Sequence, residues 1–443
     1  MHPAPTRTSA LLAAFPLCQV PAAPAVPVVP PTALITNDAV VLGLLIAVLY
    51  FVMETSSRTT GFWGKFYRYL PPLLLCYFIP AVFNSFGLIS GTTSGLYSVA
   101  TGYLLPASLV LLTLNIDFKT IRQLGPKALI MFTVGAVSIM LGGPIGVWVM
   151  SMISPEVVGG NGPDAVWKGL ATVAGSWIGG GANQVAMKEI FEPSDRLFSA
   201  VIAVDVILAY LWMALLLYGA SIVGQLDKRM GADTSAIDEV RRKIENYRAS
   251  IARIPNFLDW VRLIAIAFIP TAVAHLCADG IVPWIDANAP VLAQFSMTSR
   301  QFWIVIITTT FGLLFSFTRA KKLEGVGASR LGTLLLYMMI VVIGMRMDLF
   351  AIADQPGLLV VGAIWLVIHA VVMLVTARLI RAPFFFMAVS SQSLIGGPAS
   401  APVVASAFHP SLAPVGVLLA ILGYAVGTYG AYLCALMMRA VAP

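Results

Sequence analysis

The chain has few charged residues for its length. Only 11% of its 443 residues are charged and 59% are hydrophobic, whereas a soluble globular protein carries about 25% charged residues. The mean hydropathy of +0.89 excludes a polar exterior over most of the fold. Most of the surface must therefore face hydrocarbon, which predicts a polytopic membrane protein.

Motifs of enzyme chemistry are absent as well. The four cysteines form no CxxC pair and have no histidine at metal-ligand spacing, which argues against a disulfide framework or a zinc site. No Walker loop, HExxH or GxSxG motif occurs. We therefore predict no enzyme activity and no bound cofactor, and the missing ATP motif excludes a self-contained primary pump.

The net charge of +7 does not predict a nucleic-acid partner. Lysine and arginine occur in short stretches between apolar runs, where membrane topology explains them. The partners that we expect are the lipid bilayer and a small-molecule solute.

Residues 1–37 differ from the rest of the chain. Arg7 precedes the short apolar stretch 10–15, and an Ala/Pro/Val-rich run continues through Pro31. Two interpretations stay open: a signal peptide followed by a disordered linker, or an uncleaved flexible tail. In both cases the segment should lie outside the fold.

Apolar runs divide the remaining chain into twelve elements. Their lengths of about 20 residues favour an all-α bundle over a barrel. The runs cover 38–54, 69–90, 97–116, 127–152, 165–191, 197–224, 261–285, 301–317, 331–347, 357–377, 384–408 and 412–438.

The charge of the connections predicts the topology. Under the positive-inside rule, the basic connections are cytoplasmic: 54–68, 117–127, 225–262 and 319–330. The connections 90–97, 152–165 and 285–300 carry little positive charge and should be external.

Two glycine-broken segments occupy corresponding places in the two halves. They read S-W-I-G-G-G-A-N from Ser176 to Asn183 and S-L-I-G-G-P-A-S from Ser393 to Ser400. If each segment is a re-entrant hairpin, which leaves the membrane on the side from which it entered, every connection falls on the side that its charge predicts. A long broken helix that crosses the membrane fits the apolar lengths equally well.

The hairpin interpretation divides the chain into two inverted repeats. Each repeat holds five spans and one hairpin, so about ten transmembrane helices are expected in total, as in elevator-type transporters. The predicted repeats are 38–224 and 261–443. Between them, 225–260 is predicted to be a cytoplasmic linker with a surface helix.

The glycine breaks carry the strongest chemical argument. A helix broken inside a membrane exposes N–H and C=O groups that protein, water or a ligand must satisfy. Such breaks bind solutes and Na⁺ in secondary transporters, although close helix packing through small residues is the alternative. The candidate solute-binding residues are Ser176, Gly179, Gly180, Gly181, Asn183, Gln184, Ser393, Gly396, Gly397, Ser400 and Arg346.

Asp205 is the clearest acidic residue inside an apolar run. A carboxylate there is costly and is by default a functional hypothesis, so the candidate ion-coupling residues are Asp205, Asn183 and Ser400, with Na⁺ at Asp205 and Asn183. The alternative places Asp205 near the external end of its helix. Arg346 interrupts another apolar run and could attract a substrate carboxylate, although pairing with Asp348 or snorkelling explains it equally well.

Several motifs resemble the DUF819 (YjcL-like) family of bacterial membrane proteins. They are L-P-A-S-L-V-L-L-T-L-N-I-D from Leu105, G-S-W-I-G-G-G-A-N from Gly175, the A-V-D segment ending at Asp205, and I-G-G-P-A-S from Ile395. The resemblance covers nearly everything after residue 38 and implies no substrate. The paired glycine segments also resemble, more distantly, the hairpins of glutamate:sodium and citrate:sodium symporters, which implies an elevator-type dimer.

The sequence therefore predicts a secondary active transporter. It is expected to be a multi-pass homodimer of the bacterial inner membrane that moves a small polar or anionic organic solute, coupled to Na⁺ or H⁺. In this interpretation the hairpins and Asp205 form a moving core, and elements one, two, seven and eight supply a scaffold or dimer surface. A membrane-embedded enzyme or enzyme-complex subunit, or a channel, are the alternatives.

Overall fold

A computed structural model describes residues 33–58, 60–70, 72–114, 116, 121–122, 124–232, 255–347, 355–409 and 412–443. All regular secondary structure among these residues is helical. Most of the N-terminal segment 1–37 and most of the predicted linker 225–260 lie outside the described residues. Asp117 and Asp348 also lie outside them.

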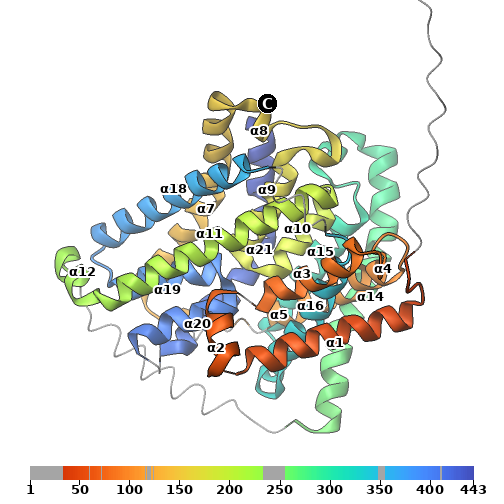
Figure 1. The fold of residues 1–443 in the computed structure, drawn as a ribbon, viewed down its shortest axis with the longest axis horizontal. Coiled ribbons are helices and arrows are strands. Elements are labelled where there is room, and N and C mark those ends of the chain that lie inside the picture. Colours follow the sequence, from red (N-terminus) through yellow and green to blue (C-terminus); the bar gives the residue numbers. More distant parts are fainter. Residues whose placement is uncertain are drawn as a thin grey trace, which may run out of the picture. The chain divides into compact units, whose positions relative to one another are not determined.

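Each of the twelve predicted elements corresponds to one helix or to a bent group of helices (Figure 1). The first half contains α1 (Asp38–Ser56), α2 (Gly61–Tyr69), α3 (Pro72–Ser85), α4 (Leu96–Val99), η1 (Ala100–Leu104), α5 (Leu105–Leu114), α7 (Pro126–Ile153), α8 (Pro155–Val158), η2 (Gly162–Asp164), α9 (Val166–Gly179), α10 (Gly181–Phe191), α11 (Asp195–Ser221) and α12 (Val223–Met230). The second half contains α14 (Phe257–Asn288), η3 (Pro290–Phe295), α15 (Arg300–Ser316), η4 (Arg319–Val326), α16 (Ala328–Gly344), α18 (Gly357–Leu379), α19 (Phe384–Ile395), α20 (Gly397–Phe408) and α21 (Ala413–Val441).

The protein is a multi-pass membrane protein. Among the described residues, seven helices or continuous helical runs are long and apolar enough to cross a membrane, or up to nine if two sharply bent pairs each form one span. The bent pairs are α2 with α3 and α15 with η4. The expected number of spans, ten, exceeds the upper number of nine by one helix. That helix is α16, which is apolar but only 17 residues long.

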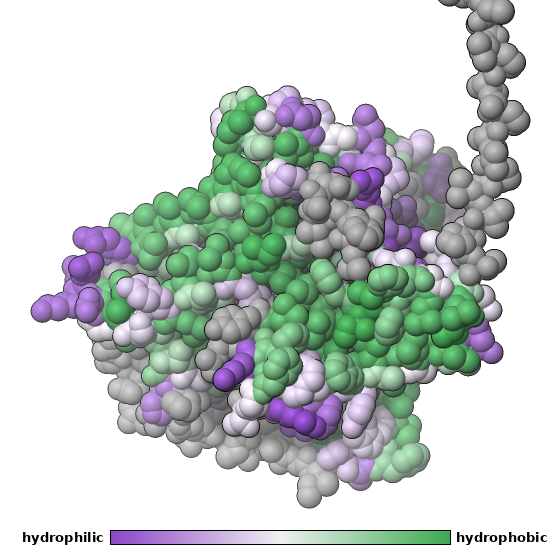
Figure 2. All heavy atoms as spheres, in the orientation of Figure 1, coloured by the Kyte–Doolittle hydropathy of each residue, from purple (hydrophilic) through white to green (hydrophobic). Residues whose placement is uncertain are grey.

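Apolar side chains cover much of the outer face of α11 and α18, which pack side by side. Figure 2 shows this apolar surface, with hydrophilic residues gathered at α12. The exposed apolar residues of α11 include Ile207, Leu211 and Leu215, and those of α18 include Val367 and Val371. This is the surface that a helix bundle presents to lipid.

The first glycine-broken segment folds back on itself. Helices α9 and α10 meet at Gly180 and pack against each other. Their outer ends are joined, because the Ser194 N–H donates to Pro163 O over 2.9 Å and the Ser194 hydroxyl donates to Asp164 over 2.5 Å. The segment is therefore a helical hairpin whose two ends lie together.

The second segment is also a hairpin, and it starts from the opposite end of the bundle. Helices α19 and α20 break at Gly396, and the Phe408 ring near the end of α20 packs on Phe385 at the start of α19, with 5.2 Å between ring centroids. The Phe384 N–H donates to the Asp227 carboxylate of α12 over 2.8 Å. Burial raises the pKa of Asp227, against the opposing effect of this hydrogen bond.

The helices form two packing groups. The first, which we call the core, consists of α7, α9, α10, α11, α18, α19, α20 and α21. The second, which we call the frame, consists of α1, α3, α5, α14, α15 and α16. Among the described helices, α10 and α21 of the core make the main contacts with the frame, where they pack on α5 and α15.

Candidate functional site

The tips of the two hairpins meet. A Cβ atom built on Gly397 would lie 3.7 Å from Gly180 Cα, so glycines from the two halves of the chain are in contact. Gly180 has a φ of 74° and Gly397 a φ of 61°, a backbone region that other residues adopt only with strain. Glycine at these two positions therefore permits the sharp reversals that bring the tips together.

A cavity of about 530 Å³ lies beside the hairpin tips. It extends from Asp205 to Ser56 and Tyr67 near the end of α1 and in α2. Each glycine-broken segment contributes one polar side chain, Ser176 or Ser400, and the apolar lining comes from α3, α11 and the second hairpin. The lining includes Leu73, Ser176, Gly180, Gly181, Asp205, Val206, Tyr210, Met213, Leu217, Tyr337, Gln392, Gly396 and Ser400.

Asp205 is held by neutral donors. The Trp177 indole N–H donates to Oδ1 over 2.6 Å and the Gln184 side-chain amide donates to Oδ2 over 2.8 Å. The Ser176 hydroxyl also hydrogen-bonds this carboxylate. Only 6% of Asp205 is exposed, and no lysine, arginine or histidine among the described residues forms an ion pair with it. The site thus contains a buried carboxylate without a basic partner.

Gln392 faces Asp205's cavity from the second hairpin. Its amide Nε2 donates to the Ser400 hydroxyl over 2.7 Å. Its Oε1 is buried and has no hydrogen-bond partner among the described residues. An unpartnered buried acceptor costs about 1–3 kcal/mol, so a hydrogen-bond donor that reached this oxygen would stabilise the site.

Asn183 points away from the cavity toward α21. Its amide Nδ2 donates to Gly179 O over 2.9 Å, and its Oδ1 accepts a hydrogen bond from Thr428. Ser393 likewise donates to the carbonyl of Ser390 in its own helix. Neither side chain lines the cavity. The structure therefore does not bring Asn183 and Asp205 together as ligands of one ion.

Arg346 belongs to a different cluster. Its Nε lies 2.9 Å from Asp195 Oδ2, an ion-pair contact without hydrogen-bond geometry. Lys188 Nζ lies 3.1 Å from Asp195 Oδ1 and donates to the Tyr97 hydroxyl over 2.7 Å. The Tyr97 hydroxyl in turn donates to Glu189 over 2.5 Å. These five residues, which we call the ionic cluster, line a separate cavity of about 320 Å³.

The ionic cluster joins the core to the frame. Lys188 and Glu189 lie on α10 and Asp195 begins α11, whereas Tyr97 lies on α4 and Arg346 follows α16. Sequence reasoning missed the two residues of α10. The signal was present, because a Lys-Glu pair near the end of a glycine-broken apolar segment is unusual.

His369 is buried within the core and fully hydrogen-bonded. The Trp212 indole N–H donates to the Ser391 hydroxyl over 2.7 Å, and His369 Nε2 lies 2.7 Å from the same hydroxyl. His369 Nδ1 lies 2.7 Å from the Ser138 hydroxyl. This series of hydrogen bonds links four helices, α11, α19, α18 and α7, so His369 is a hydrogen-bonded residue of the helix packing.

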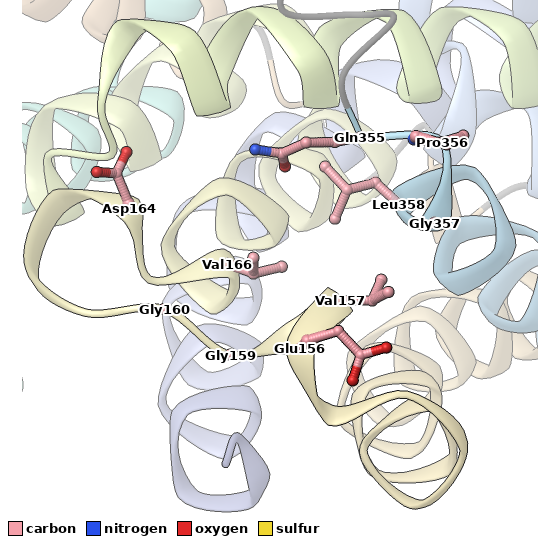
Figure 3. A pocket seen from close by; sticks show the side chains of 10 residues that line it. All are labelled: Glu156, Val157, Gly159, Gly160, Asp164, Val166, Gln355, Pro356, Gly357 and Leu358. Carbon is pink, nitrogen blue, oxygen red and sulfur yellow. The ribbon is translucent and has the colours of Figure 1, made fainter.

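A further hollow of about 390 Å³ lies between α8, η2 and the start of α18. Figure 3 shows Asp164 and Glu156 at opposite edges, with the apolar side chains of Val157, Val166 and Leu358 between them. The polar side chains of this hollow do not point toward one common position. No group of three His, Cys, Asp or Glu side chains within the described part of the chain could hold a metal ion.

A sequence profile of DUF819, described as "Protein of unknown function (DUF819)", matches residues 42–441. The chain belongs to the DUF819 family. It is also similar to a Bacillus subtilis (strain 168) relative described as "Uncharacterized membrane protein YjcL", with 26% identity over 359 residues, 79% of this chain and 85% of the relative. The predicted resemblance to the DUF819 family is confirmed.

Proposed function

We propose that this DUF819 protein is a secondary active transporter that moves a small polar organic solute across the bacterial inner membrane, coupled to Na⁺ or H⁺. The observation that carries the proposal is the meeting of two hairpin tips, from opposite ends of the bundle, beside a cavity that contains an unpaired carboxylate. A buried charge that the protein does not compensate is suited to a cation that binds and leaves.

Helix packing that matches an inverted repeat supports this proposal. If elements one to six correspond to elements seven to twelve, α5 corresponds to α16 and α7 to α18. Each of these pairs packs together, and the packing of α3 on α16 has its counterpart in that of α15 on α5. The two hairpins would then be re-entrant segments that enter from opposite membrane faces.

The division into core and frame supports an elevator mechanism. The core contains both hairpins and Asp205, so it could carry the whole site past the frame. The frame includes the third and ninth elements in addition to the four that the sequence suggested. Exposed apolar residues of α14, such as Leu276 and Trp284, make this helix our candidate surface for a homodimer.

The cavity extends toward one membrane face. Ser56 and Tyr67 line its outer part, and both belong to the 54–68 connection that the charge pattern assigns to the cytoplasm. The ionic cluster includes Asp195, which directly follows the joined outer ends of the first hairpin, at the opposite face in this topology. We infer an inward-facing state that is closed on the external side.

Uptake into proteoliposomes tests the function. The purified full chain is reconstituted with a Na⁺ or H⁺ gradient and given a panel of radiolabelled amines, amino acids and carboxylates. We expect saturable, gradient-driven accumulation of at least one solute, lost in Asp205→Asn and retained in Asp279→Asn, a control in an exposed ion pair. No accumulation of any solute under either gradient would contradict the proposal.

A channel would give a different result in the same vesicles. It would conduct without saturation and without dependence on a coupling gradient. A membrane-embedded enzyme would need convergent acid, base or metal-binding groups. Asp205 is the only acid among the described residues that line the cavity. We therefore favour transport over catalysis.

A further inference from the structure

We propose that the cavity at the hairpin tips binds an organic solute that carries a protonated amine beside an apolar or aromatic body. The proposal rests on the transport function above and names the substrate class of the same site. It revises the expectation of an anionic solute, because the charges around the cavity favour a cation.

The charge of the lining is negative. Asp205 lines the cavity, and no lysine, arginine or histidine does so among the described residues. The basic residues Lys188 and Arg346 lie at a separate cavity and are both paired with Asp195. A solute with a carboxylate and no amine would therefore meet a like charge without a basic side chain to offset it.

The free hydrogen-bonding capacity is that of acceptors. Asp205 accepts hydrogen bonds from the neutral donors Trp177, Gln184 and Ser176, whereas an ionised carboxylate offers about four acceptor positions. Gln392 Oε1 is buried and has no hydrogen-bond partner within the described part of the chain. An ammonium group carries three N–H donors and no acceptor, so it matches what these two side chains leave unsatisfied.

The remaining wall fits the body of such a solute. The apolar side chains of Leu73, Val206, Met213 and Leu217 face the cavity together with the rings of Tyr210 and Tyr337. Aromatic rings attract cations through their π-electron faces, and apolar side chains favour a hydrocarbon or aromatic group. The volume of about 530 Å³ accommodates a small molecule of this kind.

Three probes that share a phenyl body and differ in charge test the proposal. Phenethylamine, 2-phenylethanol and 3-phenylpropionate are added in turn, at pH 7, to the purified full chain in detergent, and the melting temperature is measured. A ligand that binds only the folded state raises the melting temperature by an amount that grows with ln(1 + L/Kd), where L is the ligand concentration. We expect the amine to stabilise most, the alcohol less and the carboxylate least.

Two variants assign the effect to the site. Asp205→Asn should remove the preference for the amine, and Gln392→Leu should weaken the amine response at least threefold in half-saturating concentration. Asp279→Asn changes an exposed aspartate of α14 and should leave the order unchanged.

The opposing outcomes are distinct. A larger shift with phenylpropionate, equal shifts, or no shift with any probe would overturn the amine assignment, while gradient-driven uptake of a carboxylate would leave the transport function standing. Stabilisation by Na⁺ alone, lost in Asp205→Asn, would assign the carboxylate to the ion instead. An amine preference that survives Asp205→Asn would place the binding elsewhere and overturn the proposal.

Discussion

Two aspartates of the same helix have opposite surroundings. Asp195 begins α11 and contacts two basic side chains, Lys188 and Arg346. Asp205 lies ten residues further on and has only neutral donors from Trp177 and Gln184, with the Ser176 hydroxyl nearby. The protein therefore compensates the charge of Asp195 with its own residues and leaves that of Asp205 to be compensated by something else.

This difference indicates a structural role for Asp195 and a binding role for Asp205. The partners of Asp195 come from both packing groups, because Lys188 belongs to the core and Arg346 follows a frame helix. Their attraction therefore holds the core against the frame. The donors that hydrogen-bond Asp205 all belong to the core, so its surroundings would travel with it if the core moves.

The largest expected effect is on transport by Asp205→Asn. The loss of one charge-assisted interaction of about 2–3 kcal/mol predicts a reduction in solute affinity of about 30- to 150-fold. Stability should change little, because the variant removes an unpaired buried charge but leaves one of the donors Trp177 and Gln184 without an acceptor. Thermal unfolding and uptake, measured on one preparation, check both parts. A large fall in stability would mean that Asp205 is a structural residue.

Asp195→Asn should show the reverse pattern. Lys188 is only 4% exposed, and removal of its carboxylate partner leaves a buried ammonium group, which we expect to cost about 2–3 kcal/mol. The melting temperature should fall, while the preference of the folded protein among charged probes should stay the same. A variant as stable as the parent protein would contradict the separation of tasks.

Ser391→Ala tests the neutral network behind the cavity. The Ser391 hydroxyl serves both Trp212 and His369, so its removal leaves two buried polar groups unpaired and should cost about 2 kcal/mol of stability. Ser406→Ala is the matched control, because the Ser406 hydroxyl bonds only carbonyls of its own helix. Chemical denaturation that finds equal costs for the two variants would count against a structural role for this network.

Gly180→Ala tests the hairpin tip. Alanine at a φ of 74° should cost about 1–2 kcal/mol in backbone strain and displace the tip from the cavity. Gly224→Ala is the control, because a Cβ at Gly224 would meet nothing within 4 Å and the residue lies in α12, outside the cavity lining. We expect weaker solute binding only for Gly180→Ala, measured by the same thermal shift. Equal effects would show that the reversal at Gly180 is dispensable.

Arg346→Gln should have the smallest effect on stability. The Arg346–Asp195 pair is about one-third exposed, so its loss should cost about 1 kcal/mol. Arg300→Gln, in the more exposed pair with Asp279, should cost less. We expect Arg346→Gln to change the balance between inward-facing and outward-facing conformations more than it changes stability, because Arg346 is one of the residues that join core and frame.

Much of the fold could be read from hydrophobic runs and glycine breaks. The twelve apolar runs coincide with the helical elements because a membrane span must be apolar over its whole length. The positions of Gly180 and Gly397 were also predictable, since a helix cannot reverse at an ordinary residue without strain. Seven to nine of the ten expected spans meet the length and apolarity of a membrane crossing, and α16, at 17 residues, is the apolar helix that falls short of that length.

The site was predictable only in part. Asp205 was found because a carboxylate in an apolar run is conspicuous. From the sequence alone, Asn183 and Gln184 were equally good candidates to line the site. Successive residues of a helix point about 100° apart, and in the structure Gln184 faces Asp205 while Asn183 faces α21. The pairing of Arg346 with Asp195 and the walls formed by Tyr210 and Tyr337 depend on tertiary contacts that one sequence does not contain.

Alternating exposure of the cavity is the most direct test of the account. Val206→Cys is introduced beside Asp205 in a chain whose four native cysteines are replaced by alanine, and a membrane-impermeant maleimide is applied to either side of sealed vesicles. We predict labelling from the cytoplasmic side in the parent background and increased labelling from the external side with Arg346→Gln. Labelling from one side only, at the same rate in both backgrounds, would contradict a core that carries the hairpin-tip site across the membrane.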